Sequence, residues 1–364
     1  MPIKLAEWSL AFYRLPYRRQ VVWANAVERE GIFALLKLTG DGGAVGIAEG
    51  TIKATWSGVS PRSLAATLED VIVPRLRGID LVDAAAVSAA LRPLPENGFA
   101  KAIAANACWT LRAAEAGKPL WRLWNGQRRV ELTWTVTRQT PALMATESAE
   151  VCARYGFRTL KVKGGQGVAT DLRALMEIRA ALGEGVELHV DANSEYSRAE
   201  GADYVRSLAA AGVTLAEDPC ALVPDAEFEA LQRSVPIPIL VDRSCASSRD
   251  AQLYLERGAR ALAAKPGRVG LSETRAIDVL AERHGARVAV GIYAESLLGT
   301  LVSLQQAAAL APGRSIAAEQ TFYLTMTEQV TPLELPIREG CIELPEEADL
   351  SKLVDWARVK RFAL

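Results

Sequence analysis

Hydrophobic and polar residues alternate along three segments near the N-terminus, at residues 2–9, 32–39 and 44–50. Residues 40–43, Gly-Asp-Gly-Gly, are a turn signal between the last two segments, so the alternation predicts an antiparallel sheet. Helical spacing of apolar residues follows at 63–73, 81–91 and 100–116, with a stop signal at Gly117 and Pro119. Strands followed by helices indicate an α+β domain, which we place at residues 1–127.

The pattern changes after Glu131 to short apolar runs that alternate with helix-length stretches rich in Ala, Leu and Arg. Eight such runs predict the strands of a parallel (β/α) barrel, which we place at residues 128–322. The runs cover residues 132–137, 159–163, 186–191, 213–217, 238–242, 261–265, 287–291 and 315–319. Residues 331–344 are extended again, and we expect the segment 323–364 to pack back on the first domain.

Composition narrows the classes of function. The chain has 364 residues, 50% of them hydrophobic, with 42 basic and 43 acidic side chains spread along it. We expect no nucleic-acid partner, because such a protein needs a concentrated field of positive charge. The apolar stretches are too short for a membrane span and no signal peptide is recognisable, so we expect a cytoplasmic protein. Five separated cysteines fit reduced thiols, and only two histidines leave acid–base chemistry to Lys, Asp and Glu.

Five consecutive predicted strands end on an ionisable residue. These residues are Lys163, Asp191, Glu217, Asp242 and Lys265, separated by 28, 26, 25 and 23 residues. Each separation is about the length of one βα unit, so the five charges should meet at the carboxyl end of the barrel, where barrel enzymes build their active sites. Taken singly, such an Asp commonly caps the next helix and such a Lys is commonly solvated. The ordered set favours an active site.

Three carboxylates in one place repel each other unless a divalent cation neutralises them. Asp191, Glu217 and Asp242 offer only hard oxygen atoms with no adjacent His or Cys ligand, which favours Mg²⁺ or Mn²⁺ over zinc. The open coordination positions would accept water and a small-molecule carboxylate substrate. We expect Asn193 to hold a metal ligand or a metal-bound water in place without contacting the metal itself.

Lys161 and Lys163 are two residues apart on one predicted strand, so their side chains point to the same face. We expect repulsion between the two ammonium groups and partial burial to lower the lysine pKa from ~10.4 towards ~7–8, which suits a general base. Lys265 follows four strands later and should face the pocket from the opposite side.

The strand-end motifs resemble the enolase superfamily, specifically its muconate lactonizing subgroup, over nearly the whole chain. They are Lys161-Val162-Lys163, Asp191-Ala192-Asn193, Glu217-Asp218-Pro219, Asp242 and Lys265-Pro266. The resemblance implies an N-terminal α+β capping domain completed by the C-terminal segment, and a modified (β/α)7β TIM-type barrel. It also implies an essential Mg²⁺ or Mn²⁺ and a reaction through an enolate of a carboxylate, with lysines on opposite sides as acid and base.

Several stretches are more similar to muconate cycloisomerase than to its relatives, namely residues 97–101, 134–135, 295–300, 319 and 327–330. Dipeptide epimerases of the superfamily would show an Asp-x-Asp pair on the eighth strand, where this chain has Glu319-Gln320-Thr321. We expect Glu319 to lie beside Lys265 and to raise its pKa. The candidate substrate contacts are Trp23, Lys53, Trp56, Thr135 and Glu295, although aromatic residues in a cap are more often packing residues.

Two positions and one segment depart from the subgroup. The segment is the first part of the cap, with Arg18, Arg19, Trp23, Lys53 and Trp56, which does not match the muconate enzymes closely. Arg243 stands where the subgroup usually has Glu, and we expect its guanidinium to lower a neighbouring lysine pKa or to pair with a substrate carboxylate. Gly270-Leu271 replaces the usual pair of glycines after the sixth strand.

The leading interpretation is a metal-dependent cycloisomerase of the muconate type, in which Lys161, Lys163, Lys265 and Glu319 act on a metal-stabilised enolate. It would be a homo-oligomer without a redox cofactor. An N-acylamino acid racemase or o-succinylbenzoate synthase would use the same residues, with Lys163 and Lys265 facing the α-carbon from both sides. A catalytically silent barrel would be favoured only if a metal-site residue were missing.

Overall fold

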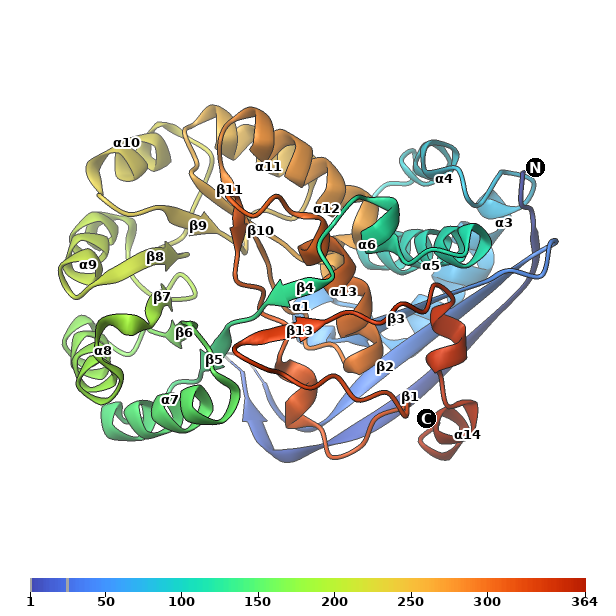
Figure 1. The fold of residues 1–364 in the computed structure, drawn as a ribbon. Helices are drawn as coiled ribbons and strands as arrows, with labels where there is room; N and C mark the ends of the chain where they lie inside the picture. The colour runs from blue at the N-terminus through green and yellow to red at the C-terminus, as the bar shows by residue number, and fades with distance from the viewer. Residues whose placement is uncertain (1, 24–25) are drawn as a thin grey trace.

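The computed structural model describes residues 2–23 and 26–364. Its N-terminal part is an antiparallel sheet of β1 (Leu5–Val22), β2 (Val27–Gly40) and β3 (Val45–Ile52), drawn in blue in Figure 1. β1 is much longer than the predicted strand at residues 2–9, because the alternation continues. Tyr13, Leu15 and Tyr17 are buried and the residues between them are exposed. Pro16 is tolerated since β1 is an edge strand.

The helices of this cap follow the sheet in the chain. They are α1 (Ala54–Ser57), α2 (Pro61–Thr67), α3 (Val73–Leu76), α4 (Ala84–Leu91), α5 (Gly98–Ala116) and α6 (Leu120–Leu123). The predicted helix at 63–73 is divided, because a π-helical turn η1 (Leu68–Ile72) separates α2 from α3. α5 packs so closely on β3 that a Cβ at Gly46 would lie 2.0 Å from the carbonyl oxygen of Ala107.

Eight parallel strands form the barrel, in the order β12-β11-β10-β9-β8-β7-β6-β5. They are β5 (Trp134–Val136), β6 (Thr159–Lys163), β7 (Glu187–Asp191), β8 (Val213–Glu217), β9 (Ile239–Val241), β10 (Ala261–Ala264), β11 (Arg287–Val290) and β12 (Ser315–Ile316). A parallel bridge between Leu132 and Ala318 joins the two ends of the sheet. Every predicted run contains one of these strands.

A helix follows each of the first seven barrel strands. The helices are α7 (Pro141–Tyr155), α8 (Val168–Leu182), α9 (Arg198–Ala210), α10 (Ala226–Ser234), α11 (Ser248–Glu256), α12 (Pro266–Arg283) and α13 (Leu297–Ala309). A short 3-10 turn η3 (Phe322–Thr325) follows β12 instead. The architecture is therefore the predicted modified (β/α)7β barrel with an N-terminal cap (Figure 1).

The C-terminal segment contacts both parts of the molecule. Met326 forms an antiparallel bridge to Tyr17, and Ala363 forms another to Tyr13, so this segment lies along β1. Near its end lie η4 (Leu350–Leu353) and α14 (Trp356–Arg361). Within the predicted extended stretch, however, β13 (Cys341–Glu343) pairs with β4 (Arg129–Glu131), the strand that leads into the barrel.

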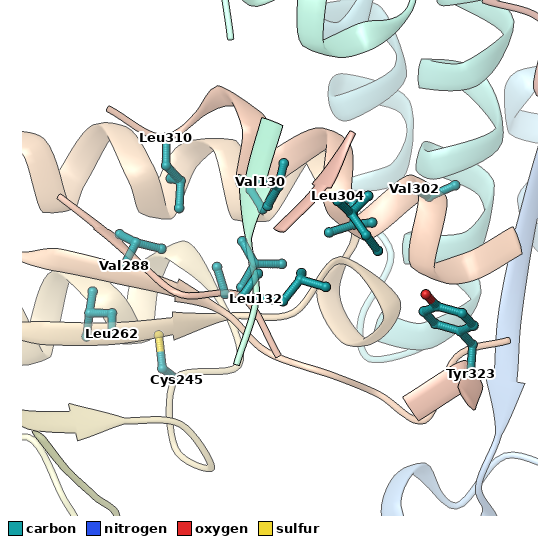
Figure 2. Packing of buried hydrophobic residues seen from close by; sticks show 14 of the residues in the cluster. Val130, Leu132, Cys245, Leu262, Val288, Val302, Leu304, Leu310 and Tyr323 are labelled. Atoms are coloured by element: carbon teal, nitrogen blue, oxygen red, sulfur yellow. The ribbon is translucent and has the colours of Figure 1, made fainter. Parts of the chain in front are cut away.

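The largest hydrophobic cluster runs from the cap sheet into the barrel and includes Tyr13 of β1 together with Leu132 and Leu262, part of which Figure 2 shows. A second cluster lies mainly in the cap, and a third, small one consists of Leu215, Leu240, Ala261, Ala263, Ala289 and Ile316. These are strand residues of the barrel, so apolar side chains fill its interior below the carboxyl ends of the strands. Within the described part of the chain, no helix is long and apolar enough to cross a membrane.

Candidate active site

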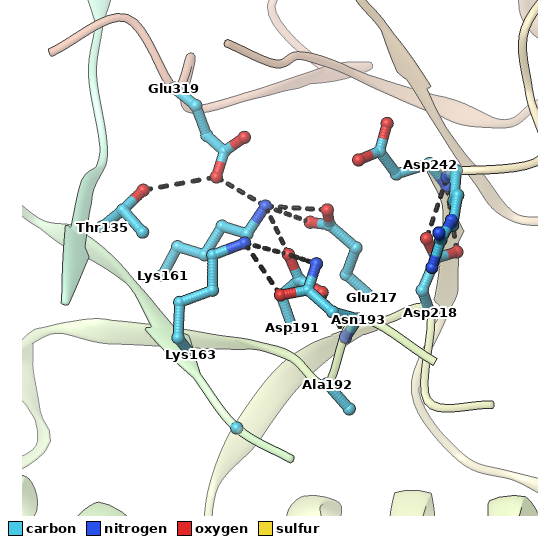
Figure 3. A network of polar contacts seen from close by, with 12 residues as sticks. Thr135, Lys161, Lys163, Asp191, Ala192, Asn193, Glu217, Asp218, Asp242 and Glu319 are labelled. Carbon is cyan, nitrogen blue, oxygen red and sulfur yellow. Dashed lines mark hydrogen bonds and ion pairs between the residues drawn. The ribbon is translucent and has the colours of Figure 1, made fainter. Parts of the chain in front are cut away.

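The predicted ionisable residues lie at the carboxyl ends of the barrel strands, and Figure 3 shows four of them, Lys163, Asp191, Glu217 and Asp242. Lys163, Asp191 and Glu217 are the last residues of β6, β7 and β8, and they are paired neighbours in the sheet. Asp242 and Lys265 come directly after β9 and β10. The spacing of about one βα unit therefore brings all five residues to one end of the barrel.

Lys161 is the most enclosed of the three lysines at this end of the barrel, with 4% of its side chain exposed. Its Nζ is 3.1 Å from Asp191 Oδ2, 2.7 Å from Glu217 Oε1 and 2.6 Å from Glu319 Oε1. Burial lowers its pKa, but the attraction of these three carboxylates outweighs burial and raises the pKa well above the ordinary value. The expected lowering of the pKa is therefore wrong for Lys161, because its nearest charged groups are anions.

Lys163 is more accessible, with 25% of its side chain exposed. Its Nζ donates to Asp191 Oδ2 at 2.5 Å and to Asn193 Oδ1 at 3.4 Å. Asn193 also donates its backbone N–H to Asp191 Oδ1 at 2.8 Å, so it orients this carboxylate as expected. Burial opposes ionisation of Asp191, yet Lys161 and Lys163 hold the pKa of its carboxyl far below the ordinary value.

Lys265 approaches from the opposite side of the barrel and forms an ion pair with Asp242 Oδ2. Burial lowers its pKa, while the Asp242 carboxylate raises it and prevails; Glu319 contributes less. Glu319 thus raises the pKa of Lys265 as expected, but less than Asp242 does, and the ion pair of Glu319 is with Lys161. A Cβ at Gly291 would lie 2.6 Å from Lys265 Cε, so this glycine leaves the space that the lysine occupies.

Two residues without an assigned role in the sequence analysis complete this side of the site. Arg268, in the first turn of α12, donates to the carbonyl oxygens of Asp242 at 3.0 Å and of Cys245 at 2.7 Å. Its Nη1 is 3.4 Å from Asp242 Oδ1. The guanidinium that lowers the pKa of Lys265 belongs to Arg268, whereas the side chain of Arg243 is exposed. A signal existed in the sequence, because Arg268 is one helical turn after Lys265.

Asp218 is the second of these residues. It is buried at a left-handed φ of 38° and accepts the backbone N–H groups of Asp242 at 3.1 Å and Arg243 at 2.8 Å. Burial and repulsion from Asp242 raise its pKa to about 7. Asp218 thus ties the end of β8 to the end of β9.

The side chains of residues 319–321, after the eighth strand, point in different directions. Glu319 accepts from Thr135 Oγ1 at 3.4 Å and pairs with Lys161, so its carboxylate belongs to the site. Gln320 is fully buried and donates to the carbonyl oxygen of Gly291 at 2.9 Å. Thr321 Oγ1 donates to the carbonyl oxygen of Thr133. Only one carboxylate of this segment is therefore directed to the pocket.

The predicted substrate contacts fall into different places. Trp23, Lys53 and Trp56 form one cluster in the cap, where the Lys53 Nζ lies 4.3 Å and 5.2 Å from the centroids of the two indole rings. Glu295 is only 2% exposed, and its carboxylate accepts from Tyr293 N at 2.5 Å and Ser303 Oγ at 3.1 Å. The carboxylate of Glu295 is thus bonded to its own loop and to α13, and its contact with a substrate stays a prediction.

Comparison with known proteins agrees with this geometry. The family model of enolase C-terminal domain-like proteins matches residues 143–352, more than half of the chain. The chain belongs to the enolase superfamily. It is similar to the L-Ala-D/L-Glu epimerase of Bacillus subtilis (strain 168), with 31% identity over 75% of this chain and 76% of that protein.

Two further superfamily members match over nearly their full length. Muconate cycloisomerase 1-2 of Acinetobacter lwoffii is 26% identical over 99% of this chain and 95% of its own. The N-succinylamino acid racemase of Thermus thermophilus is 28% identical over 100% and 98%. The muconate lactonizing enzyme from Pseudomonas fluorescens, solved with muconolactone, has the same fold, with a TM-score of 0.90, 23% identity and full coverage of both chains.

Enolase superfamily enzymes generally use a divalent metal ion such as Mg²⁺. The donor set here fits such an ion, since Asp191, Glu217 and Asp242 lie on adjacent strands and Asp242 Oδ1 is buried without a hydrogen-bond partner. As the side chains of residues 2–23 and 26–364 are placed, no three His, Cys, Asp or Glu side chains are arranged so that they could hold a metal ion. Lys161 lies between two of these carboxylates, and Lys265 pairs with the third.

Proposed function

We propose that this enzyme of the enolase superfamily is a metal-dependent cycloisomerase that lactonises an unsaturated dicarboxylate. The observation that carries the proposal is the unequal accessibility of its lysines. The exposed side-chain fraction is 25% for Lys163, 12% for Lys265 and 4% for Lys161. One open lysine and two enclosed ones suit a reaction with a single proton transfer to carbon.

Asp191, Glu217 and Asp242 are the groups that would hold Mg²⁺ or Mn²⁺. When bound, the ion would supply positive charge that holds a substrate carboxylate and stabilises the negative charge developing on it. Asn193 and Asp218 keep two of these carboxylates in place through the backbone contacts described above.

The chain's own residues perform the remaining work. One carboxylate of the substrate attacks the conjugated double bond, a C–O bond forms, and the π electrons move onto the other end as an enolate. The Lys161 ammonium, held by Glu319, presents a fixed positive charge to the enolate. Lys163 delivers a proton to the α-carbon and recovers one from solvent, so one proton is taken up for each lactone formed.

An N-acylamino acid racemase is the second candidate. The observation in its favour is that Lys163 on β6 and Lys265 after β10 approach from opposite sides, as removal and return of an α-proton require. A dipeptide epimerase is less well supported, because Gln320 and Thr321 are bonded to backbone carbonyl oxygens and provide no second carboxylate for a substrate ammonium group.

The experiment is a turnover assay in D₂O with Mg²⁺ or Mn²⁺. With cis,cis-muconate we expect lactone that carries deuterium on one face of one carbon, and with either enantiomer of N-succinyl or N-acetyl amino acids we expect no exchange of the α-proton. Lys163→Ala is the control and should remove the lactone. Exchange with both enantiomers of an N-acylamino acid would replace this proposal with the racemase.

A further inference from the structure

The side chain of Arg138 joins the backbone after two neighbouring barrel strands. Arg138 comes two residues after β5, and its Nε donates to the carbonyl oxygen of Gly164 at 2.7 Å. Its Nη2 donates to the carbonyl oxygen of Ala192 at 3.3 Å, and its Nη1 pairs with Glu195 Oε1 at 3.2 Å. The guanidinium thus bridges the loop after β6 and the loop after β7. We call its two contacts with carbonyl oxygens the Arg138 clamp.

Both acceptors of Arg138 are next to residues of the site. Gly164 directly follows Lys163 at the end of β6. Ala192 directly follows Asp191, whose carboxylate accepts from Lys163 (Figure 3). The backbone N–H of Gly164 also donates to the carbonyl oxygen of Asp191 at 2.9 Å. A displacement of either loop would therefore move the Lys163 ammonium relative to this carboxylate.

The loop after β7 needs such a support because its backbone is strained. Asn193 and Ser194 have left-handed φ angles of 52° and 64°, which residues with a side chain seldom adopt. The carbonyl oxygen of Ala192, which Arg138 binds, lies directly before this turn. The turn presents Asn193 Oδ1 to Lys163 Nζ at 3.4 Å. Arg138 thus stabilises the base of a turn whose side chain contacts the lysine.

The loop after β6 leaves space for the guanidinium at Gly165. This residue has a φ of 81°, and a Cβ there would lie 2.6 Å from Arg138 Nη2 and 2.8 Å from the carbonyl oxygen of Ala192. Any side chain would therefore enter between donor and acceptor. The same loop is fixed independently by Asp171, which accepts the backbone N–H groups of Gly165 at 2.8 Å and Gln166 at 3.1 Å. Loss of Arg138 should therefore shift the loop without unfolding it.

We propose that Arg138 is a positioning residue that holds Lys163 in place against Asp191 by joining the two loops. The proposal rests on the proposed function only in taking Lys163 as the residue that moves the proton. A guanidinium suits this role because its planar fork of donors reaches two carbonyl oxygens at fixed angles, whereas a lysine ammonium is a point charge on a flexible stem. Lys265 is held by Asp242 on the opposite side of the barrel, so the effect should be confined to Lys163.

The first experiment measures the accessibility of Lys163 and needs no turnover. Limited acetylation of the full-length enzyme at pH 8, with and without Mg²⁺, followed by peptide mass spectrometry, gives the relative reaction rate of each lysine. An ammonium held by charge-assisted hydrogen bonds reacts slowly. Arg138→Met should therefore raise the rate at Lys163 by about fivefold or more, and the rate at Lys265 should stay within about twofold of the wild-type value.

Arg179→Met is a matched control at the other end of the barrel. The guanidinium of Arg179 also donates to backbone carbonyl oxygens, in the loops that lead into β7 and β8. These acceptors are Gly183 at 3.0 Å, Val186 at 2.6 Å and Gly212 at 3.2 Å. The substitution removes the same type of contact, so it should lower the melting temperature by a similar amount but change the acetylation rate of neither Lys163 nor Lys265.

Turnover with Mg²⁺ gives the second readout, with muconate or an N-succinylamino acid as substrate. Arg138→Met should lower kcat by about tenfold or more and change KM by less than about threefold, because the clamp acts on the proton carrier and not on substrate contacts. Arg138→Lys should behave like Arg138→Met in both experiments, because it keeps the charge but not the fork of donors. The lysine variant thus separates the clamp from an effect of charge alone.

An unchanged acetylation rate of Lys163 in Arg138→Met, or an equal rise at Lys163 and Lys265, would overturn the proposal. Wild-type protection of Lys163 in Arg138→Lys would overturn it as well. If Arg138→Met does not fold, Arg138→Lys carries both measurements. Faster acetylation of Lys163 without muconate turnover by the wild-type enzyme refutes only the cycloisomerase, and muconate turnover with unchanged acetylation refutes only the clamp.

Discussion

Replacement of Glu295 by glutamine should make the free energy of unfolding less dependent on pH. The carboxylate is 2% exposed, and burial together with repulsion from Glu49 raises its pKa from 4.5 to about 7. Between these two values the native state holds a proton that the unfolded chain has released. The native state is therefore favoured at low pH, and this contribution is lost as the pH rises towards 7.

The size of the effect follows from the two pKa values. Two and a half pH units at about 1.4 kcal/mol each amount to about 3.5 kcal/mol of unfolding free energy. The glutamine of Glu295→Gln binds no proton. As the pH rises from 5 to 8, the unfolding free energy of this variant should therefore increase by about this amount relative to that of the wild type.

Urea unfolding of both proteins at pH 5, 6, 7 and 8 measures the difference directly, and other titrating groups cancel in it. Glu30→Gln, at a carboxylate with 41% of its side chain exposed, is the control and should run parallel to the wild type. A difference between Glu295→Gln and wild type that changes by less than about 1 kcal/mol over this range would refute the reasoning.

Three further predictions concern the site. Lys163→Ala should abolish turnover but change Mg²⁺ affinity by less than about threefold in calorimetry. Substantial residual turnover would instead assign delivery of the proton to Lys265. Asp242→Asn should weaken Mn²⁺ binding, followed by electron paramagnetic resonance, by roughly tenfold or more; unchanged affinity would remove this residue from the metal site. Gly291→Ala should lower kcat roughly tenfold through displacement of the Lys265 side chain, with a melting temperature within a few degrees of wild type; an unchanged kcat would contradict the close contact.

The strand ends could be predicted from the sequence because a barrel fixes their spacing. Once each apolar run is a strand and each interval is a helix, Lys163, Asp191 and Glu217 must lie at neighbouring strand ends. The extent of β1 could have been found as well, since the alternation continues past Ser9 to Tyr17. The many polar residues on the exposed face of β1 made this alternation hard to recognise.

The partners of each charge could not be predicted in the same way. Glu319 reaches Lys161 because the barrel closes between Leu132 and Ala318, which brings the eighth strand beside the first. Strand order along the chain says only that Glu319 is nearer in sequence to Lys265. Likewise, the burial of Glu295 depends on how the loop before α13 folds back on its own backbone, and no local pattern encodes this.

The contacts of β1 also determine the order in which the molecule can be completed. This strand is the edge of the cap sheet, and the residues that cover its open side are far away in the chain; Thr327 and Pro16, which share a hydrogen bond there, are 311 residues apart. During synthesis β1 emerges before the barrel, so its open edge has no partner until residues after the barrel have been made. The exposed side chains of Arg14, Arg18 and Arg19 put positive charge on that edge. This charge discourages pairing with other chains before the C-terminal residues cover the edge. The cap is thus among the first parts to be made and the last to be closed.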